Sequence, residues 1–122
     1  MMAPLPFPSA EQVIADGLAT HAGLDVVGEP CTIKAGGIDY GPLPVFVRTY
    51  RREELVPGGP IEQGDFRAMI YWPSFEALGI GRRLERADRL VWRERLYSIL
   101  QFDDATHSAA GQIFAVELQL RG

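Results

Sequence analysis

The chain has 122 residues, of which 47% are hydrophobic and 23% are charged. This composition is ordinary for a single globular domain over residues 1–122 and unlike that of a disordered or membrane-spanning chain. A net charge of −4 provides no basic field for nonspecific nucleic-acid binding, and one cysteine excludes an internal disulfide. The first residues lack the pattern of a signal peptide, so we expect neither export nor a membrane partner.

The N-terminal segment predicts an amphipathic helix over about residues 10–22. Ser9 followed by Gln12 is a capping-box signature, and Gly23 is the expected left-handed stop. His21 falls on the apolar face, where a partly buried histidine with satisfied hydrogen bonds is the expected state.

Two strands are predicted next. Residues 31–34 form a short β-like run in which Cys31 is expected to be a small core side chain. Residues 36–42, with Gly36-Gly37 and Gly41-Pro42, indicate a connection rich in turns. Residues 44–51 alternate but carry bulky side chains on both faces, so this strand should be covered on two sides or lie at an interface.

A long exposed loop is predicted over about residues 52–64. Its prolines and glycines cannot continue a ladder and permit unusual backbone angles. Loops of this length are uncommon in compact domains and are often functional. The candidate functional residues in it are Arg52, Glu53, Glu54, Val56, Pro57, Gly58, Gly59, Pro60 and Glu62.

The second half predicts more strands. Residues 65–72 alternate, and residues 73–78 fit one or two helical turns ended by Gly79 or Gly81. Residues 88–121 read as a hairpin followed by a final strand, 112–121. In this strand one face carries Phe114, Val116, Leu118 and Leu120, and the opposite, outward face carries Ala115, Glu117, Gln119 and Arg121. The whole predicts a mainly β fold, a small antiparallel β-barrel of five to six strands with an N-terminal α-helix and one short helical insert.

Few residues suggest enzyme chemistry. Asp103, Asp104 and His107 could ligate a metal or form an acid/base pair, but such a cluster in a polar loop is more typical of turn chemistry. We therefore expect no catalysis, no metal and no cofactor.

The aromatic side chains leave two interpretations open. They could stack bases on a barrel that binds oligonucleotides, but their places in alternating strands favour roles in the core or in subunit contacts. These residues are Trp72, Trp92, Tyr97 and Phe102.

Arginines are concentrated between residues 82 and 95, with acidic residues among them. A solvated, salt-bridged surface is the favoured interpretation, and a subunit interface or local phosphate contacts are the alternatives. The candidate interface residues are Arg82, Arg83, Arg86, Arg93 and Arg95.

Four segments together suggest a family. They are Ile61-Glu-Gln-Gly-Asp65, Ala87-Asp-Arg-Leu-Val-Trp92, Arg95-Leu-Tyr-Ser-Ile99 and Glu117-Leu-Gln-Leu-Arg-Gly122. In this order the chain resembles the small head–tail joining proteins of tailed bacteriophages, also called head-closure, stopper or neck proteins, which have relatives in prophages and gene-transfer particles. One departure is the Arg93-Glu94 turn, which disfavours the positive φ angles of a two-residue turn and predicts a longer loop.

The resemblance implies a subunit of a ring, expected to be a hexamer, in the virion neck between portal or adaptor proteins above and tail-terminator or tail proteins below. Such particles assemble in the bacterial host cytoplasm, and the loop over residues 52–64 would project into the channel as its gate. Glu53, Glu54, Glu62 and Asp65 would then repel the phosphates of packaged DNA, which is contacted without sequence specificity. The alternatives are an adaptor or tail-terminator ring, a nucleic-acid-binding barrel and, least favoured, a small hydrolase.

Overall fold

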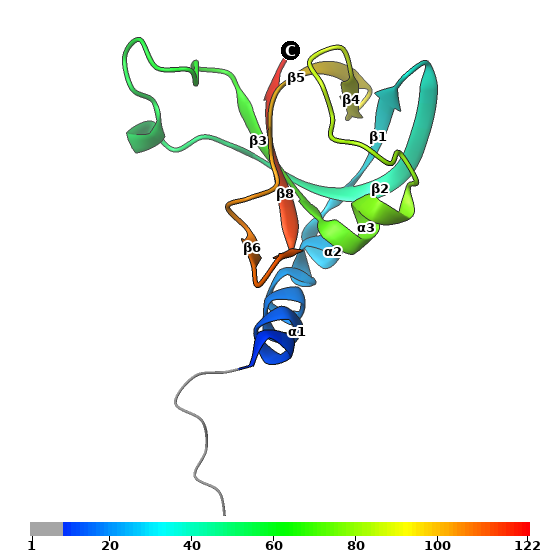
Figure 1. Ribbon diagram of the computed structural model, residues 1–122. Coiled ribbons are helices and arrows are strands. Elements are labelled where there is room, and N and C mark those ends of the chain that lie inside the picture. Colours follow the sequence, from blue (N-terminus) through cyan, green and yellow to red (C-terminus); the bar gives the residue numbers. More distant parts are fainter. Residues whose placement is uncertain (1–8) are drawn as a thin grey trace, which may run out of the picture.

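The computed structural model describes residues 9–122, and strands dominate it (Figure 1). The helices are α1 (Ala10–His21), α2 (Gly23–Val27), the 3-10 helix η1 (Arg52–Glu54) and α3 (Trp72–Ala77). The strands are β1 (Glu29–Ala35), β2 (Ile38–Thr49), β3 (Phe66–Tyr71), β4 (Arg89–Trp92), β5 (Arg95–Asp103), β6 (Ser108–Ala109), β7 (Gln112–Ile113) and β8 (Ala115–Arg121). No helix within residues 9–122 is long and apolar enough to cross a membrane.

Six strands form a closed barrel in the order β1-β2-β3-β8-β5-β4, and every neighbouring pair is antiparallel. This confirms the predicted mainly β barrel with an N-terminal helix. Because the sheet closes on itself, the barrel presents no open edge for strand addition. The remaining strands, β6 and β7, form a separate two-stranded hairpin.

The helix α1 begins as predicted but ends differently. The Ser9 hydroxyl oxygen accepts a hydrogen bond from the Gln12 backbone N–H at 3.2 Å. The predicted glycine stop is wrong, because Ala22 in right-handed helical geometry is the C-cap and Gly23 opens α2. The stop comes at Gly28, where an added Cβ would meet the backbone of Leu24 and Val45 at 2.8 Å. Close packing of α2 on β2, rather than a left-handed residue, therefore ends the helical segment.

The strand β2 is longer than predicted. Gly36 and Gly37, with φ of +58° and +78°, connect β1 directly to β2. The Gly41-Pro42 pair was expected in a turn but lies inside β2, where the register with β1 shifts between Cys31 and Ile33. Proline has no N–H to donate to the ladder, and an irregularity of this kind accommodates it within a strand.

The turn between β4 and β5 has two residues, contrary to the longer loop that we expected. Arg93 and Glu94 have φ of 50° and 64°, and Trp92 pairs with Arg95. The Arg93 guanidinium lies 4.6 Å from the Trp92 ring centroid and donates to the carboxylate of Glu29 at 2.6 and 2.9 Å. These contacts offset the cost of left-handed geometry at a residue with a side chain.

The final strand is the most enclosed of the barrel. It lies between β3 and β5, and Val116, Leu118 and Leu120 are fully buried, as the alternation predicted. The opposite face is also partly covered, because Ala115 and Gln119 are buried. Phe114 is not a barrel side chain: it stands between β7 and β8, and its ring packs against Gly17 of α1.

The inward side chains fill the barrel. Burial of each large apolar side chain contributes roughly 1.5–3 kcal/mol relative to exposure, so this set supplies the main stabilisation. The largest fully buried members are Ile33, Val45, Ile70, Leu90, Ile99, Val116, Leu118 and Leu120.

The predicted helical insert is α3. It has proline in its first turn, as predicted, and the chain leaves it at Gly79, whose φ is +76°. Phe75 of α3 is 4% exposed and its ring lies 5.7 Å from that of Phe102, so the insert packs onto the barrel wall.

Candidate functional site: the β2–β3 loop and its anchors

The segment between β2 and β3 projects away from the barrel, on a side away from α1 and α3 (Figure 1). It begins with η1 and continues without regular structure to Phe66. The predicted long loop over residues 52–64 is therefore confirmed as an element of structure. Its two ends are held by different polar networks, and its middle is exposed.

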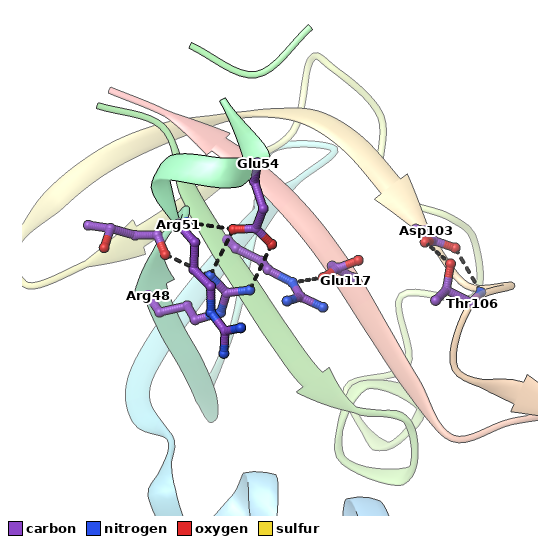
Figure 2. A network of polar contacts seen from close by, with 8 residues as sticks. Arg48, Arg51, Glu54, Asp103, Thr106 and Glu117 are labelled. Atoms are coloured by element: carbon purple, nitrogen blue, oxygen red, sulfur yellow. Dashed lines mark hydrogen bonds and ion pairs between the residues drawn. The ribbon is translucent and has the colours of Figure 1, made fainter. Parts of the chain in front are cut away.

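Glu54 holds the first end of the loop. Its carboxylate accepts hydrogen bonds from both terminal nitrogens of Arg48 at 3.2 and 3.3 Å and from the Arg51 backbone N–H (Figure 2). These bonds, those from Arg48 first, lower the pKa of Glu54 to about 2. Glu54 thus fastens η1 back onto β2, and its charge is neutralised locally.

A second ion pair lies beside this anchor. Arg67 of β3 pairs with Glu117 of β8, and Figure 2 shows Glu117 beside the Arg48 and Glu54 contacts. The two residues are diagonal neighbours on the paired strands, because the register pairs Arg67 with Gln119 and Glu117 with Met69. The outer surface at the base of the loop is therefore a set of paired charges.

Asp65 holds the second end of the loop. It is 3% exposed and accepts from the Arg121 guanidinium at 2.8 and 2.9 Å, from Gln119 Nε2 at 2.9 Å and from the Glu62 backbone N–H at 2.9 Å. The Arg121 bonds are the largest cause that lowers the pKa of Asp65 to about 2. Gln119 also donates to the carbonyl oxygen of Pro60 at 2.9 Å. The last residues of β8 therefore hold the returning end of the loop.

Between the anchors lies the tip, Val56–Gly59. A backbone bond of 2.8 Å from the Gly59 N–H to the Val56 carbonyl closes it as a turn, and Gly58 has φ of +77°. Val56 is 63% exposed although it is apolar. Of the other predicted loop residues, Arg52, Glu53, Pro57, Pro60 and Glu62 are exposed.

The charge of the loop differs from the expectation. Asp65 and Glu54 were expected to repel DNA phosphates, but each is neutralised by an arginine of the barrel. Glu62 remains 66% exposed at 3.5 Å from Arg121, and no described residue forms an ion pair with Glu53. The acidic surface of the loop is thus reduced to Glu53 and Glu62.

An open groove separates the loop from the barrel. Its volume is about 560 Å³. Its lining residues are Thr49, Tyr50, Arg52, Leu55, Glu62, Gln63, Gly64 and Asp65. Residues from both ends of the loop line this groove, so the loop stands off the barrel between them.

The arginine-rich segment is largely paired, as the favoured interpretation predicted. Arg82 bonds to buried Asp88 at 2.7 and 2.9 Å, and Arg83 donates to the Phe102 carbonyl at 2.7 Å. Arg93 is held by Glu29. Arg86 and Arg95 are exposed, and no described residue receives a hydrogen bond from their side chains. Of the candidate interface residues, these two are available to a neighbouring molecule.

The Asp103 loop has the predicted turn chemistry. The Asp103 carboxylate accepts from the backbone N–H groups of Ala105 and Thr106 at 2.9 and 3.0 Å and from the Thr106 hydroxyl (Figure 2). Asp104 lies 3.7 Å from Arg83 instead. Residues 9–122 contain no group of three or more potential metal ligands.

The other candidate side chains belong to the core. Cys31 is 2% exposed, and burial raises the pKa of its thiol to about 12, so it is an unreactive apolar residue. Trp92, Tyr97 and Phe102 are also buried, and Trp72 packs against the core. Trp92 and Tyr97 therefore belong to the barrel interior, whereas Trp72 and Phe102 also line a pocket beside α3.

Sequence reasoning found the loop but missed its anchors. Asp65 was expected at the surface, and Gln119 and Arg121 were assigned only to the outward face of the last strand. The spacing of one strand gives no information about a contact with a distant loop. The alternation did place Gln119 and Arg121 on one face of the strand. Two donors on the same face could have suggested that both side chains bind one hydrogen-bond acceptor.

No family model matches this chain, and neither a curated protein nor a solved structure matches it.

Proposed function

We propose that this protein is a structural, non-enzymatic subunit of the neck of a tailed phage or phage-like particle, where it forms a ring between head and tail and closes the DNA channel. The observation that carries the proposal is the β2–β3 loop. A closed barrel supports one long projection that is fastened at both ends by buried or paired carboxylates and is free only at its tip. This is the construction that a channel plug requires.

The barrel would act as the wall of the ring. Its closure removes strand edges as a route of association, so neighbours would meet through side-chain surfaces, loops or α1. The segment with Arg86 and Arg95 is one candidate contact, because both side chains are exposed and have no partner within residues 9–122. We propose a hexamer, with portal or adaptor proteins on one side and tail proteins on the other.

The tip would act as the gate. Val56 and Pro57 offer apolar surface that several copies could bury against one another at the centre of a ring. Glu53 and Glu62 at the sides of the tip would be repelled by DNA phosphates and would keep passing DNA from adhering. The contact with DNA would be independent of sequence.

Assembly tests the proposal. We expect the purified protein to form rings, alone or on a portal complex, as seen by electron microscopy and by mass measurement in solution. Arg86→Glu with Arg95→Glu should reduce ring formation without changing the fold. Lys34→Glu is the matched charge reversal, because Lys34 is an exposed cation elsewhere on the barrel. A protein that stays monomeric and joins no particle would refute the proposal.

An adaptor or a tail-terminator ring remains an alternative within the same class. The position of the subunit in a particle distinguishes the three roles. An adaptor would lie directly on the portal, a stopper beneath the adaptor, and a tail terminator at the top of the tail tube. A nucleic-acid-binding barrel predicts salt-sensitive binding to single strands, lost on Trp72→Ala. The burial of the other aromatic rings gives that alternative no support.

A further inference from the structure

The two histidines of this chain meet at one joint. His21 lies at the end of α1, and His107 lies just before β6, with most of the chain between them. Their ring centroids are 5.4 Å apart in an edge-on arrangement, and the His21 ring also stacks on Phe114 at 5.5 Å. The sequence pattern grouped His107 with Asp103 and Asp104 and did not pair it with His21, so the meeting of the two histidines is a result of the fold.

This joint is the main attachment of α1 to the barrel region. No residue of α1 is buried, so the helix has little apolar contact to hold it. At Gly17 an added Cβ would lie 2.2 Å from the Phe114 ring, which shows how closely the helix approaches there. Phe114 is fixed in turn by a 2.7 Å bond from its N–H to the His107 carbonyl oxygen. The docking of α1 therefore depends on two imidazoles and one phenyl ring.

The hydrogen bonds at the joint fit a neutral His107 ring. His21 Nδ1 lies 2.7 Å from the Gly17 carbonyl oxygen and must donate to it. His107 Nε2 is buried and has no hydrogen-bond partner within residues 9–122. A proton on that nitrogen would create an unsatisfied donor that carries part of a positive charge, which is costly in a buried position.

The charges around the joint oppose protonation on balance. Burial, His21 and Arg67 of β3 lower the pKa of His107, and only Asp103 of β5 raises it. Asp103 is already engaged by Ala105 and Thr106, and Arg67 is paired with Glu117 of β8. The acidic residues of α1, Glu11 and Asp16, are exposed.

We propose that the His21–His107 joint is a proton-controlled latch, which holds α1 on the barrel region while the His107 imidazole is neutral and releases α1 when that ring is protonated. Undocking of α1 removes His21 from the His107 ring and lets water reach that ring, and histidine in water titrates near pH 6.5. Undocked protein then binds more protons than docked protein, so docking is favoured above that pH and weakens as the pH falls below it. This device is independent of the proposed role in a neck.

Hydrogen exchange of backbone amides, corrected for the intrinsic exchange rate at each pH, measures the docking. With a chelator present to remove adventitious metal, we expect the amides of α1 to lose protection between pH 7.5 and 5.5, because the lowered pKa of docked His107 makes docking weaken as the pH falls. Amides of Ile70 and Leu118 in the barrel core should keep their protection. Equal protection of α1 at both pH values would overturn the proposal.

His107→Phe is the deciding variant, because a phenyl ring is apolar, is of similar size and has no nitrogen that requires a hydrogen-bond partner. It should keep α1 protected at pH 5.5. A His107→Phe protein that releases α1 at the same pH as the unmodified protein would contradict the latch. If that variant fails to fold, an NMR titration of the unmodified protein decides: a His107 midpoint at or above the ordinary value near 6.5 would also contradict it.

Discussion

The barrel and the β2–β3 loop are stabilised by different means, although they are joined through the same strands. The barrel is held by apolar side chains that are fully buried, whereas the loop is held by two carboxylates that bind arginines and backbone N–H groups. Hydrophobic burial is insensitive to pH, but carboxylate anchors depend on ionisation. This difference indicates that the barrel should stay folded when the tip of the loop is substituted or when the carboxylate anchors at its base are broken.

The largest difference in the loss of stability is expected between alanine substitutions of a core side chain and of a side chain at the tip of the loop. Leu118→Ala should destabilise the protein by about 2–5 kcal/mol, because Leu118 is fully buried between β3 and β5. Val56→Ala should change stability by less than about 0.5 kcal/mol, because Val56 is 63% exposed. Denaturation in urea measures both, and similar losses would show that the tip is part of the folding unit.

Removing the second anchor of the loop should destabilise the protein less than truncating a core side chain. Asp65→Asn removes the charge that Arg121 and Gln119 bind, and we expect a loss of about 2 kcal/mol in urea denaturation. Glu53→Gln, an exposed carboxylate in the same loop, is the control and should be nearly neutral. An Asp65→Asn protein as stable as the unmodified one would mean that the anchor does not hold the loop.

The anchors also predict an acid response. The pKa of Asp65 falls from 3.8 to about 2 in the folded protein, and that of Glu54 falls from 4.5 to about 2. A lowered folded-state pKa stabilises the protein above the unfolded value, and this stabilisation is lost as the pH falls from about 4.5 towards about 2. Urea midpoints across this range should decline, and less steeply in Asp65→Asn. Identical slopes in the two proteins would contradict the assignment.

A small gain in stability is expected from a glycine substitution in the β4–β5 turn. Glu94 has φ of 64°, and no described residue forms an ion pair with its side chain. Glu94→Gly should therefore stabilise the barrel by about 0.5–1 kcal/mol, because glycine adopts positive φ without steric cost. Arg93→Gly is the contrast, since it also loses the contacts with Glu29 and Trp92. Thermal unfolding compares them, and a destabilised Glu94→Gly would show that this turn is held by something else.

The sequence was sufficient for features with a local physical cause. The Ser9 cap, the alternation of the last strand and the prolines and glycines of the loop each act within a few residues. They predicted the helix start, the barrel strands and the projecting segment. Arg93 shows the limit of local rules, because its left-handed geometry is held by Glu29, a residue that is close only in the folded chain.

The same limit explains what was missed at the sites. Asp65 was interpreted as an exposed acidic residue because its partners, Gln119 and Arg121, are far from it in the sequence, near the C-terminal end. Phe114 was read as a barrel side chain because the alternation runs through it, although the backbone turns there to reach His107. Such contacts follow from sheet closure, which the pattern of a single strand cannot show.

The most direct test of the proposed function removes only the tip. Deleting Pro57 and Gly58 joins residues that the Gly59 to Val56 bond already brings together, so both anchors and the barrel should be preserved. In particles assembled with this variant, we expect the heads to fill and then lose their DNA. Ile38→Asp is the control, because Ile38 is 55% exposed at the start of β2 and remote from the loop in sequence. Full retention of DNA by particles with the shortened tip, measured by nuclease protection, would contradict the account.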